Sequence, residues 1–176
     1  MKISTKGEYG FRAMIFIAME GEEGPVTSAE IAQRQAIPEP YLRQILAQLA
    51  KSGLVRSNRG PQGGHTLARP AEEVSLRDIL VALEGRTTSV DQILSLPCNI
   101  EVGTRFCSIR EVLLKVKNAV EEILSDLSLA ALVTRQREIL ERRIEIPLDL
   151  PAAECPGAGS LDALVDLEVP TPTEKS

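Results

Sequence analysis

Apolar side chains recur every three or four residues in three segments of the first half of the chain, which is the spacing of one helix face. The first segment, residues 5–19, carries on one face Tyr9, Ala13, Phe16 and Ile17. We expect this helix to begin at Thr5, because Glu8 follows three residues later at the spacing of a capping box. A shorter helix is predicted to begin in the same way at Thr27, which is followed by Glu30 at the same spacing.

The third segment, AIPEPYLRQILAQLAKSG at residues 36–53, is predicted to be an amphipathic helix with Gly53 as its C-terminal glycine. Its apolar stripe consists of Leu42, Ile45, Leu46 and Leu49. Its opposite face is polar around the small Ala47 and carries Glu39, Arg43, Gln44, Gln48 and Lys51. Side chains of these types can hydrogen-bond to base edges, so the pair of helices predicts a helix-turn-helix whose second helix enters the major groove. An ordinary helical hairpin with a polar outer face is the alternative.

The next stretch, residues 54–70, reads LVRSNRGPQGGHTLARP and predicts a β-hairpin. A hairpin directly after a recognition helix is a wing, and glycines keep its loop slim enough to approach DNA. We expect Arg59 at the tip to enter a minor groove, and Arg56 and Arg69 on the strands to contact phosphates. His65 is expected to be a strand residue without a chemical role, because a metal site would need further ligands nearby.

Beyond the wing, Ser75 is predicted to cap a helix with Asp78 at its third position and Gly85 at its end. A loop is expected over residues 86–107. From residue 108 a long helix carries on one apolar stripe Ile109, Val112, Leu113, Val116, Val120, Ile123, Leu124 and Leu127. So long a stripe needs a covering surface, and we expect the same helix of a second subunit in a two-fold homodimer. Packing within one monomer is the alternative.

Composition limits the classes of protein to consider. The chain has 176 residues, of which 43% are hydrophobic and 3% aromatic, so we expect an aliphatic core of packed helices. No apolar run approaches the roughly 20 residues that span a bilayer, and the first residues lack the apolar part of a signal peptide. We therefore expect a cytoplasmic protein with no membrane partner. Three irregularly spaced cysteines do not predict a secreted disulfide framework.

Charge is distributed unevenly along the chain. The formal net charge is -5, yet residues 1–70 hold nine Lys and Arg against six Glu, and residues 71–176 hold eleven against nineteen Asp and Glu. Residues 40–70 contain five basic residues and no acid. A basic segment in an acidic chain is typical of a surface that faces nucleic acid.

Three segments together resemble a known family: MKISTKGEYGFRAM, the run AEIAQRQAIPEPYLRQILAQLAKSGLVRSNRGPQGGHTLARPAEEVSLRDILVALEG, and SLAALV. They are similar to the winged-helix regulators typified by IscR, NsrR and CymR, and the likeness covers residues 1–133. The resemblance implies a homodimeric transcription factor, usually a repressor, that binds a partly palindromic operator. It implies base reading at Glu39, Arg43 and Gln44 and a minor-groove contact at Arg59. Pro38 and Pro40 stand where the family more often has small polar residues, so we expect the start of this helix to lack the hydrogen bonds that those residues would make.

The full set of predicted DNA-contact residues is Glu39, Tyr41, Arg43, Gln44, Gln48, Lys51, Arg56, Arg59 and Arg69. The predicted fold class is mainly α with a small β-hairpin wing. We expect one regulator unit over residues 1–146, made of a winged helix-turn-helix head (1–85), a sensor loop (86–107) and dimerisation helices (108–146). Residues 147–176 hold five prolines and six acids and are expected to form a disordered tail that contains Cys155.

The resemblance also implies a sensor in the loop, where cluster-binding relatives carry three cysteines. This chain has Cys98 and Cys107 there and lacks the middle one. Some relatives complete a cluster with an acid at the position of Glu8, so a [2Fe-2S] cluster on Cys98, Cys107 and Glu8 is one alternative. A reversible disulfide between the two cysteines is a second. The third is no redox function, with a peptide or small-molecule effector bound in the dimer instead.

Two other function classes are weighed against a DNA-binding regulator. An enzyme is not expected, because one histidine, no phosphate-binding GxxxxGK motif and no nucleophile paired with a base leave nothing to carry catalysis. A winged-helix adaptor that binds proteins instead of DNA is the alternative. An adaptor does not require residues 40–70 to be free of acid, and its binding to a protein partner would respond weakly to salt.

Overall fold

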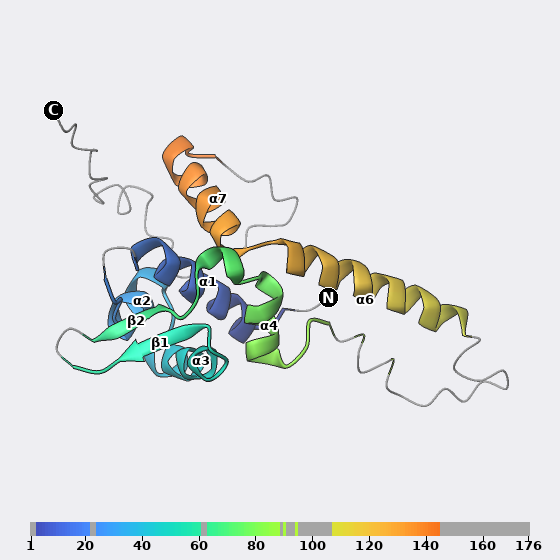
Figure 1. Cartoon of the computed structure of the whole chain (residues 1–176), viewed down its shortest axis with the longest axis horizontal. Helices are drawn as coiled ribbons and strands as arrows, with labels where there is room; N and C mark the ends of the chain where they lie inside the picture. The colour runs from blue at the N-terminus through green and yellow to red at the C-terminus, as the bar shows by residue number, and fades with distance from the viewer. Residues whose placement is uncertain are drawn as a thin grey trace. The chain divides into compact units, whose positions relative to one another are not determined.

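The computed structural model of the chain describes residues 3–21, 24–60, 63–88, 90, 94 and 107–144 (Figure 1). The elements in order are α1 (Thr5–Glu20), α2 (Ser28–Gln35), α3 (Glu39–Lys51), β1 (Val55–Asn58), β2 (Gly64–Leu67), the 3-10 turn η1 (Ala71–Glu73), α4 (Leu76–Glu84), α6 (Ser108–Asp126) and α7 (Leu129–Arg142). The chain divides into the units Met1–Ile144 and Glu145–Ser176, and every described residue belongs to the first. Helices with one small hairpin confirm the predicted fold class. The predicted tail lies outside the described residues.

The start of α1 differs from the sequence prediction. Ser4, with extended backbone, is the N-cap and accepts a hydrogen bond from the Gly7 amide at 3.2 Å, so the prediction of Thr5 as the cap of a box with Glu8 is wrong. The acid that contacts the cap comes from α4: Glu84 Oε1 accepts from the Ser4 amide at 3.1 Å and from its hydroxyl at 2.8 Å. A contact between distant segments therefore decides which residue caps the helix.

The other two predicted caps are present. The Thr27 hydroxyl accepts from the Glu30 amide at 3.2 Å at the start of α2. Ser75 and Asp78 form a complete capping box at the start of α4, which ends at Gly85 with φ of 76°. Each such cap contributes about 0.5–2 kcal/mol because it satisfies an amide that the helix leaves unpaired.

A single aliphatic core holds α1, α2, α3 and α4 together. The stripe of α3 is entirely enclosed, since Leu42, Ile45 and Leu49 are 0% exposed and Leu46 is 1% exposed. Facing it from α1 are the buried side chains of Ala13, Met14, Phe16 and Ile17. Burial of one such large apolar side chain stabilises the fold by roughly 1.5–3 kcal/mol, so this stripe fixes which face of α3 is left outside.

The turn between α2 and α3 is three residues long and tightly specified. Ala36 adopts the left-handed conformation with φ of 49° and ψ of 46°. The next residue, Ile37, is 3% exposed and donates its amide to the Ala32 carbonyl at 3.0 Å. Arg12 of α1 reaches across and donates to the carbonyl of Gln35. These contacts define the mutual angle of α2 and α3 and hence of the helix-turn-helix.

The hairpin pairs β1 with β2 in antiparallel register, with Val55 opposite Leu67 and Ser57 opposite His65. A backbone bridge from Val26 to His65 ties β2 to the segment before α2. Farther along, the Ser75–Ser128 bridge joins the start of α4 to the start of α7, which packs on α1. No helix in the described part of the chain is long and apolar enough to cross a membrane.

Candidate DNA interface

Polar side chains cover the face of α3 that the core leaves outside. Arg43, Gln44, Ala47 and Lys51 are exposed, and Glu39 and Gln48 are half-buried at its edges. Pro38 is the N-cap residue and makes no side-chain hydrogen bond, and Pro40 follows at the second helical position. The face therefore begins with prolines that donate nothing and continues with a surface of Arg, Gln and Lys side chains able to hydrogen-bond to bases.

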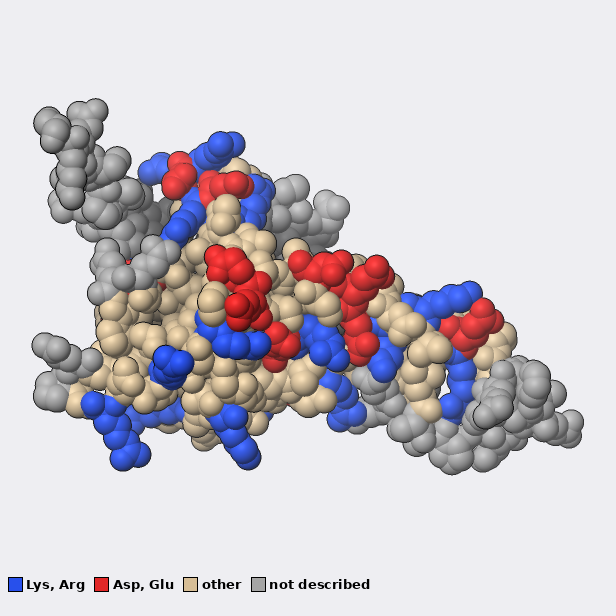
Figure 2. Space-filling model, viewed as in Figure 1, with Lys and Arg blue, Asp and Glu red and all other residues tan. Residues whose placement is uncertain are grey.

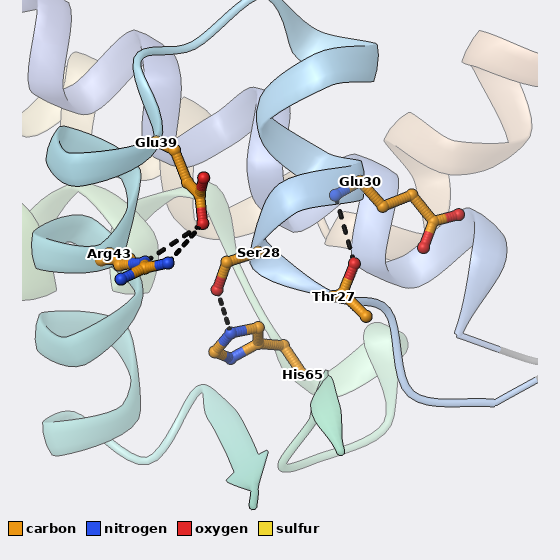
Figure 3. A network of polar contacts seen from close by, with 6 residues as sticks. All are labelled: Thr27, Ser28, Glu30, Glu39, Arg43 and His65. Atoms are coloured by element: carbon orange, nitrogen blue, oxygen red, sulfur yellow. Dashed lines mark hydrogen bonds and ion pairs between the residues drawn. The ribbon is translucent and has the colours of Figure 1, made fainter. Parts of the chain in front are cut away.

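Glu39 and Arg43, one turn apart on this face, form an ion pair (Figure 3). The Arg43 side chain is 68% exposed and that of Glu39 37% exposed. A pair at this spacing and exposure contributes only about 0.3–0.5 kcal/mol to stability. Its effect is on orientation, because it holds both side chains over the first turns of α3.

Tyr41 occupies a different environment from the other predicted contacts. Its ring is half-buried and meets Tyr9 of α1 edge to face, with the centroids 6.0 Å apart and the planes at 73°. The guanidinium of Arg12 lies 5.6 Å from the centre of the Tyr9 ring. Tyr41 thus braces α3 against α1. The Tyr9–Tyr41 contact joins two helices, so no local spacing in the sequence indicates it, whereas Arg12 and Tyr9 lie three positions apart on α1.

The hairpin presents its arginines beside α3. Arg56 on β1 and Arg59, one residue beyond its end, are both exposed. The prediction of Arg69 on a strand is wrong, because β2 ends at Leu67; Arg69 is exposed and pairs with Asp78 at 3.5 Å. Lys and Arg side chains project from the lower part of the molecule in Figure 2, over the hairpin and α3, whereas Asp and Glu gather over η1 and the end of α6. The structure thus places the basic part of the chain on the hairpin and the outer face of α3.

His65 makes more contacts than the sequence predicts. It lies on β2 as expected, but its Nε2 lies 2.8 Å from the Ser28 hydroxyl and its Nδ1 lies 2.9 Å from the Ser57 hydroxyl. Burial lowers the pKa of His65 below its ordinary value. Ser57 faces His65 across the predicted hairpin, whereas Ser28 is distant along the chain, so no local pattern could have identified the Ser28 contact.

The three residues suggested for a metal or redox site are only partly described. Cys107 is the half-buried N-cap residue of α6, and Cys98 lies outside the described residues. Glu8 is exposed on α1, and its carboxylate lies 3.7 Å from Arg12. Within the described ranges no group of three or more His, Cys, Asp and Glu side chains could hold a metal ion. Glu8 and Cys107 by themselves fall short of the four ligands that a cluster takes.

The long helix α6 carries an apolar face without cover from the described part of this chain. Its exposed members include Ile109 at 69%, Ile123 at 60%, Val112 at 58% and Val116 at 48%. Only Leu124, at 7% exposed, is buried. A hydrogen bond from the Thr87 hydroxyl to Glu121 at 3.0 Å anchors the helix beside α4.

Comparison with known proteins agrees with this geometry. Residues 3–135 match the model of the Rrf2 family, described as "Iron-dependent Transcriptional regulator". The HTH-type transcriptional regulator CymR of Bacillus subtilis is 35% identical over 134 residues, which cover 76% of this chain and 91% of CymR. These names are those of transcriptional regulators, which agrees with the expectation that the chain is not an enzyme.

Two solved structures share the fold. The structure of CymR, the global cysteine regulator of B. subtilis, aligns with a TM-score of 0.65 and 34% identity over 77% of this chain and 98% of CymR. The structure of IscR from T. potens aligns with a TM-score of 0.64 and 38% identity over 84% of this chain and 94% of IscR. With its winged helix-turn-helix head, its acid-free basic stretch and a family match over most of its length, the chain belongs to the Rrf2 family of DNA-binding transcriptional regulators.

Proposed function

We propose that this regulator is a sequence-specific repressor that acts as a homodimer on a partly palindromic operator. The observation that carries the proposal is the orientation of α3, whose apolar stripe is enclosed while its polar face lies outside beside the basic hairpin. A helix of this kind fits the major groove, and a hairpin beside it reaches the flanking minor groove.

The contacts divide into three kinds. Glu39, Arg43 and Gln44 read base edges from the start of α3, and Gln48, Lys51 and the exposed part of Tyr41 extend that surface. Arg56 and Arg69 contact phosphates, which adds affinity without sequence preference. Arg59 enters the minor groove next to the site read by α3.

The homodimer is proposed from α6. Ile109, Val112, Val116 and Ile123 leave an apolar stripe facing solvent, and the same stripe on a second subunit covers it in a two-fold contact. Two heads joined in this way bind half-sites spaced about one helical turn, roughly 34 Å, or a multiple of it. Three alternatives stand for the input that controls this dimer: a cluster on Cys98, Cys107 and Glu8, a disulfide between the two cysteines, or a peptide or small molecule bound in the dimer.

Binding to duplex DNA at several salt concentrations tests the proposal. We expect affinity to fall steeply with added salt, and a footprint of two related half-sites. Binding by a protein-interaction adaptor would respond weakly to salt. One footprint at a concentration where the protein is demonstrably monomeric would contradict the homodimer, and affinity that is indifferent to salt would contradict DNA binding through the basic hairpin.

A further inference from the structure

Three segments of the chain meet at His65. Its backbone exchanges two hydrogen bonds with Val26, at 3.0 and 2.7 Å, directly before α2. Its ring lies between the hydroxyl of Ser28, the first residue of α2, and that of Ser57 on β1 (Figure 3 shows the Ser28 contact). A single side chain therefore links the hairpin both to itself and to the first helix of the helix-turn-helix.

The chemistry of the two contacts suits a neutral imidazole. One ring nitrogen donates and the other accepts, and a serine hydroxyl can do either, so both bonds form in either tautomer. Burial favours the neutral form, as the lowered pKa of His65 indicates. Both ring nitrogens of His65 thus have a serine hydroxyl as hydrogen-bond partner.

We propose that His65 is a positioning residue that fixes the hairpin against the N-terminus of α2 and so sets where Arg59 lies relative to α3. This inference rests on the proposed function, in which α3 and Arg59 contact the same DNA. A two-stranded hairpin is marginally stable alone, so its orientation depends on its attachments to the head. Only Asn58 separates Ser57 from Arg59, so a shift of β1 moves the arginine with it.

The two hydroxyl contacts have different consequences. Ser57 and His65 are partners in the β1–β2 register, so their side-chain bond restrains the hairpin only within itself. The bond to Ser28 crosses from the hairpin to α2 and restrains the hairpin relative to the head. Loss of the Ser28 contact should therefore weaken DNA binding, and loss of the Ser57 contact is the matched control.

Two amide substitutions separate these bonds at the same position. In His65→Gln the longer side chain places its amide nitrogen near the position of Nε2, so the Ser28 contact is retained. In His65→Asn the shorter side chain reaches only the position of Nδ1, so the Ser57 contact is retained and the Ser28 contact is lost. Ser28→Ala removes the Ser28 contact and Ser57→Ala removes the Ser57 contact without changing His65 itself.

Affinity for a duplex that the wild type binds is measured at fixed salt for all four variants. Because one hydrogen bond contributes about 1 kcal/mol, we expect Ser28→Ala and His65→Asn to bind roughly fivefold more weakly. Ser57→Ala and His65→Gln should stay within about twofold of the wild type. In an Arg59→Ala background the first two should have no further effect, because the residue they position is gone.

A second measurement keeps the inference separate from the proposed function. Hydrogen exchange of the amides of Val26 and residue 65, without DNA, reports how firmly the hairpin is attached. We expect faster exchange in His65→Asn than in His65→Gln. A wild type that binds no duplex refutes the proposed function. The exchange rates then still test whether His65 attaches the hairpin to α2. Equal exchange in the two variants, equal losses in Ser28→Ala and Ser57→Ala, or a loss that persists without Arg59 would overturn the inference.

Discussion

Arg43 contacts Glu39 through two donors, with Nη2 at 2.6 Å and Nε at 3.2 Å from the same carboxylate oxygen, Oε1. The guanidinium thus lies along α3 with its remaining N–H groups pointing elsewhere. A base that accepts from Arg43 must either share it with Glu39 or displace Glu39. The two residues are therefore expected to act together in sequence recognition.

Arg43→Ala is expected to cost on the order of 1–3 kcal/mol on the best operator and to relax the preference for sequence. Glu39→Ala should raise affinity for unrelated duplexes, because it removes a negative charge from the surface that faces the negatively charged DNA, and should lower discrimination between operators. Binding to the best operator and to a scrambled duplex of equal length measures both effects. Unchanged discrimination in both variants would show that the pair does not read bases.

Arg56→Ala should behave differently from Arg43→Ala. A lost phosphate contact weakens binding to all sequences alike and lowers the slope of log affinity against log salt by about one unit. Arg135→Ala is the control, since this exposed arginine lies on α7 and pairs with Glu138 at 2.9 Å. Its slope should equal that of the wild type. A loss of sequence preference in Arg56→Ala would contradict the division into base and phosphate contacts.

Val112→Asp tests the dimer, because Val112 is 58% exposed in the uncovered stripe of α6. A carboxylate there would be buried against its counterpart in a two-fold contact, so we expect a monomer by sedimentation. Operator affinity should fall by about 10²–10⁴-fold, the gain that joining two binding modules gives. Ser125→Asp, at an exposed polar position of the same helix, should leave both unchanged. A Val112→Asp protein that remains dimeric would place the interface elsewhere.

Local patterns in the sequence predicted much of the head. The stripe of Leu42, Ile45, Leu46 and Leu49 fixed the face of α3, and Ser75 with Asp78 marked the start of α4. Where prediction failed, a distant residue decided the result. Ser4 caps α1 in place of the predicted Thr5, and the Glu84 carboxylate accepts hydrogen bonds from the Ser4 amide and hydroxyl.

Two contacts of the site have no counterpart in the local sequence pattern. The edge-to-face contact of Tyr41 with Tyr9 and the bond from His65 to Ser28 join elements that no spacing rule relates. The face that a helix buries can be predicted from sequence, because it depends on residues three or four positions apart. Contacts between elements depend on the packed fold, and for these the structure was needed.

The lowered pKa of His65 predicts how stability depends on pH. In the unfolded chain this histidine binds a proton near pH 6.5, whereas in the folded protein burial holds its pKa lower. The unfolded state thus binds more protons as pH falls below about 6.5, so the contribution of His65 to stability is complete above that pH and decreases below it. Urea unfolding of the wild type and His65→Gln between pH 7.5 and about 5 measures it. If the free energy of unfolding changed with pH in the same way in both proteins, His65 would not be the source of the pH dependence.

Cys107 is the N-cap residue of α6, so ligation or oxidation at Cys98 and Cys107 would act at the start of the helix proposed to join the two heads. A change there can bias the spacing of the heads, a population shift of about 1–3 kcal/mol. Cys98→Ser and Cys107→Ser should keep the fold and the dimer but lose any response of operator affinity to oxidants, nitric oxide or iron depletion. Cys155→Ser is the control and should respond as the wild type does.

An absorption spectrum of protein purified without oxygen separates the alternatives, because an iron-sulfur cluster is coloured and a thiol pair is not. Colour that is lost in Cys98→Ser, Cys107→Ser and Glu8→Ala supports the cluster. A colourless protein whose operator affinity changes reversibly with oxidant supports the disulfide. A wild type whose affinity is indifferent to every one of these treatments would exclude redox sensing, and leaves a peptide or small ligand bound between α6 and the winged head as the input.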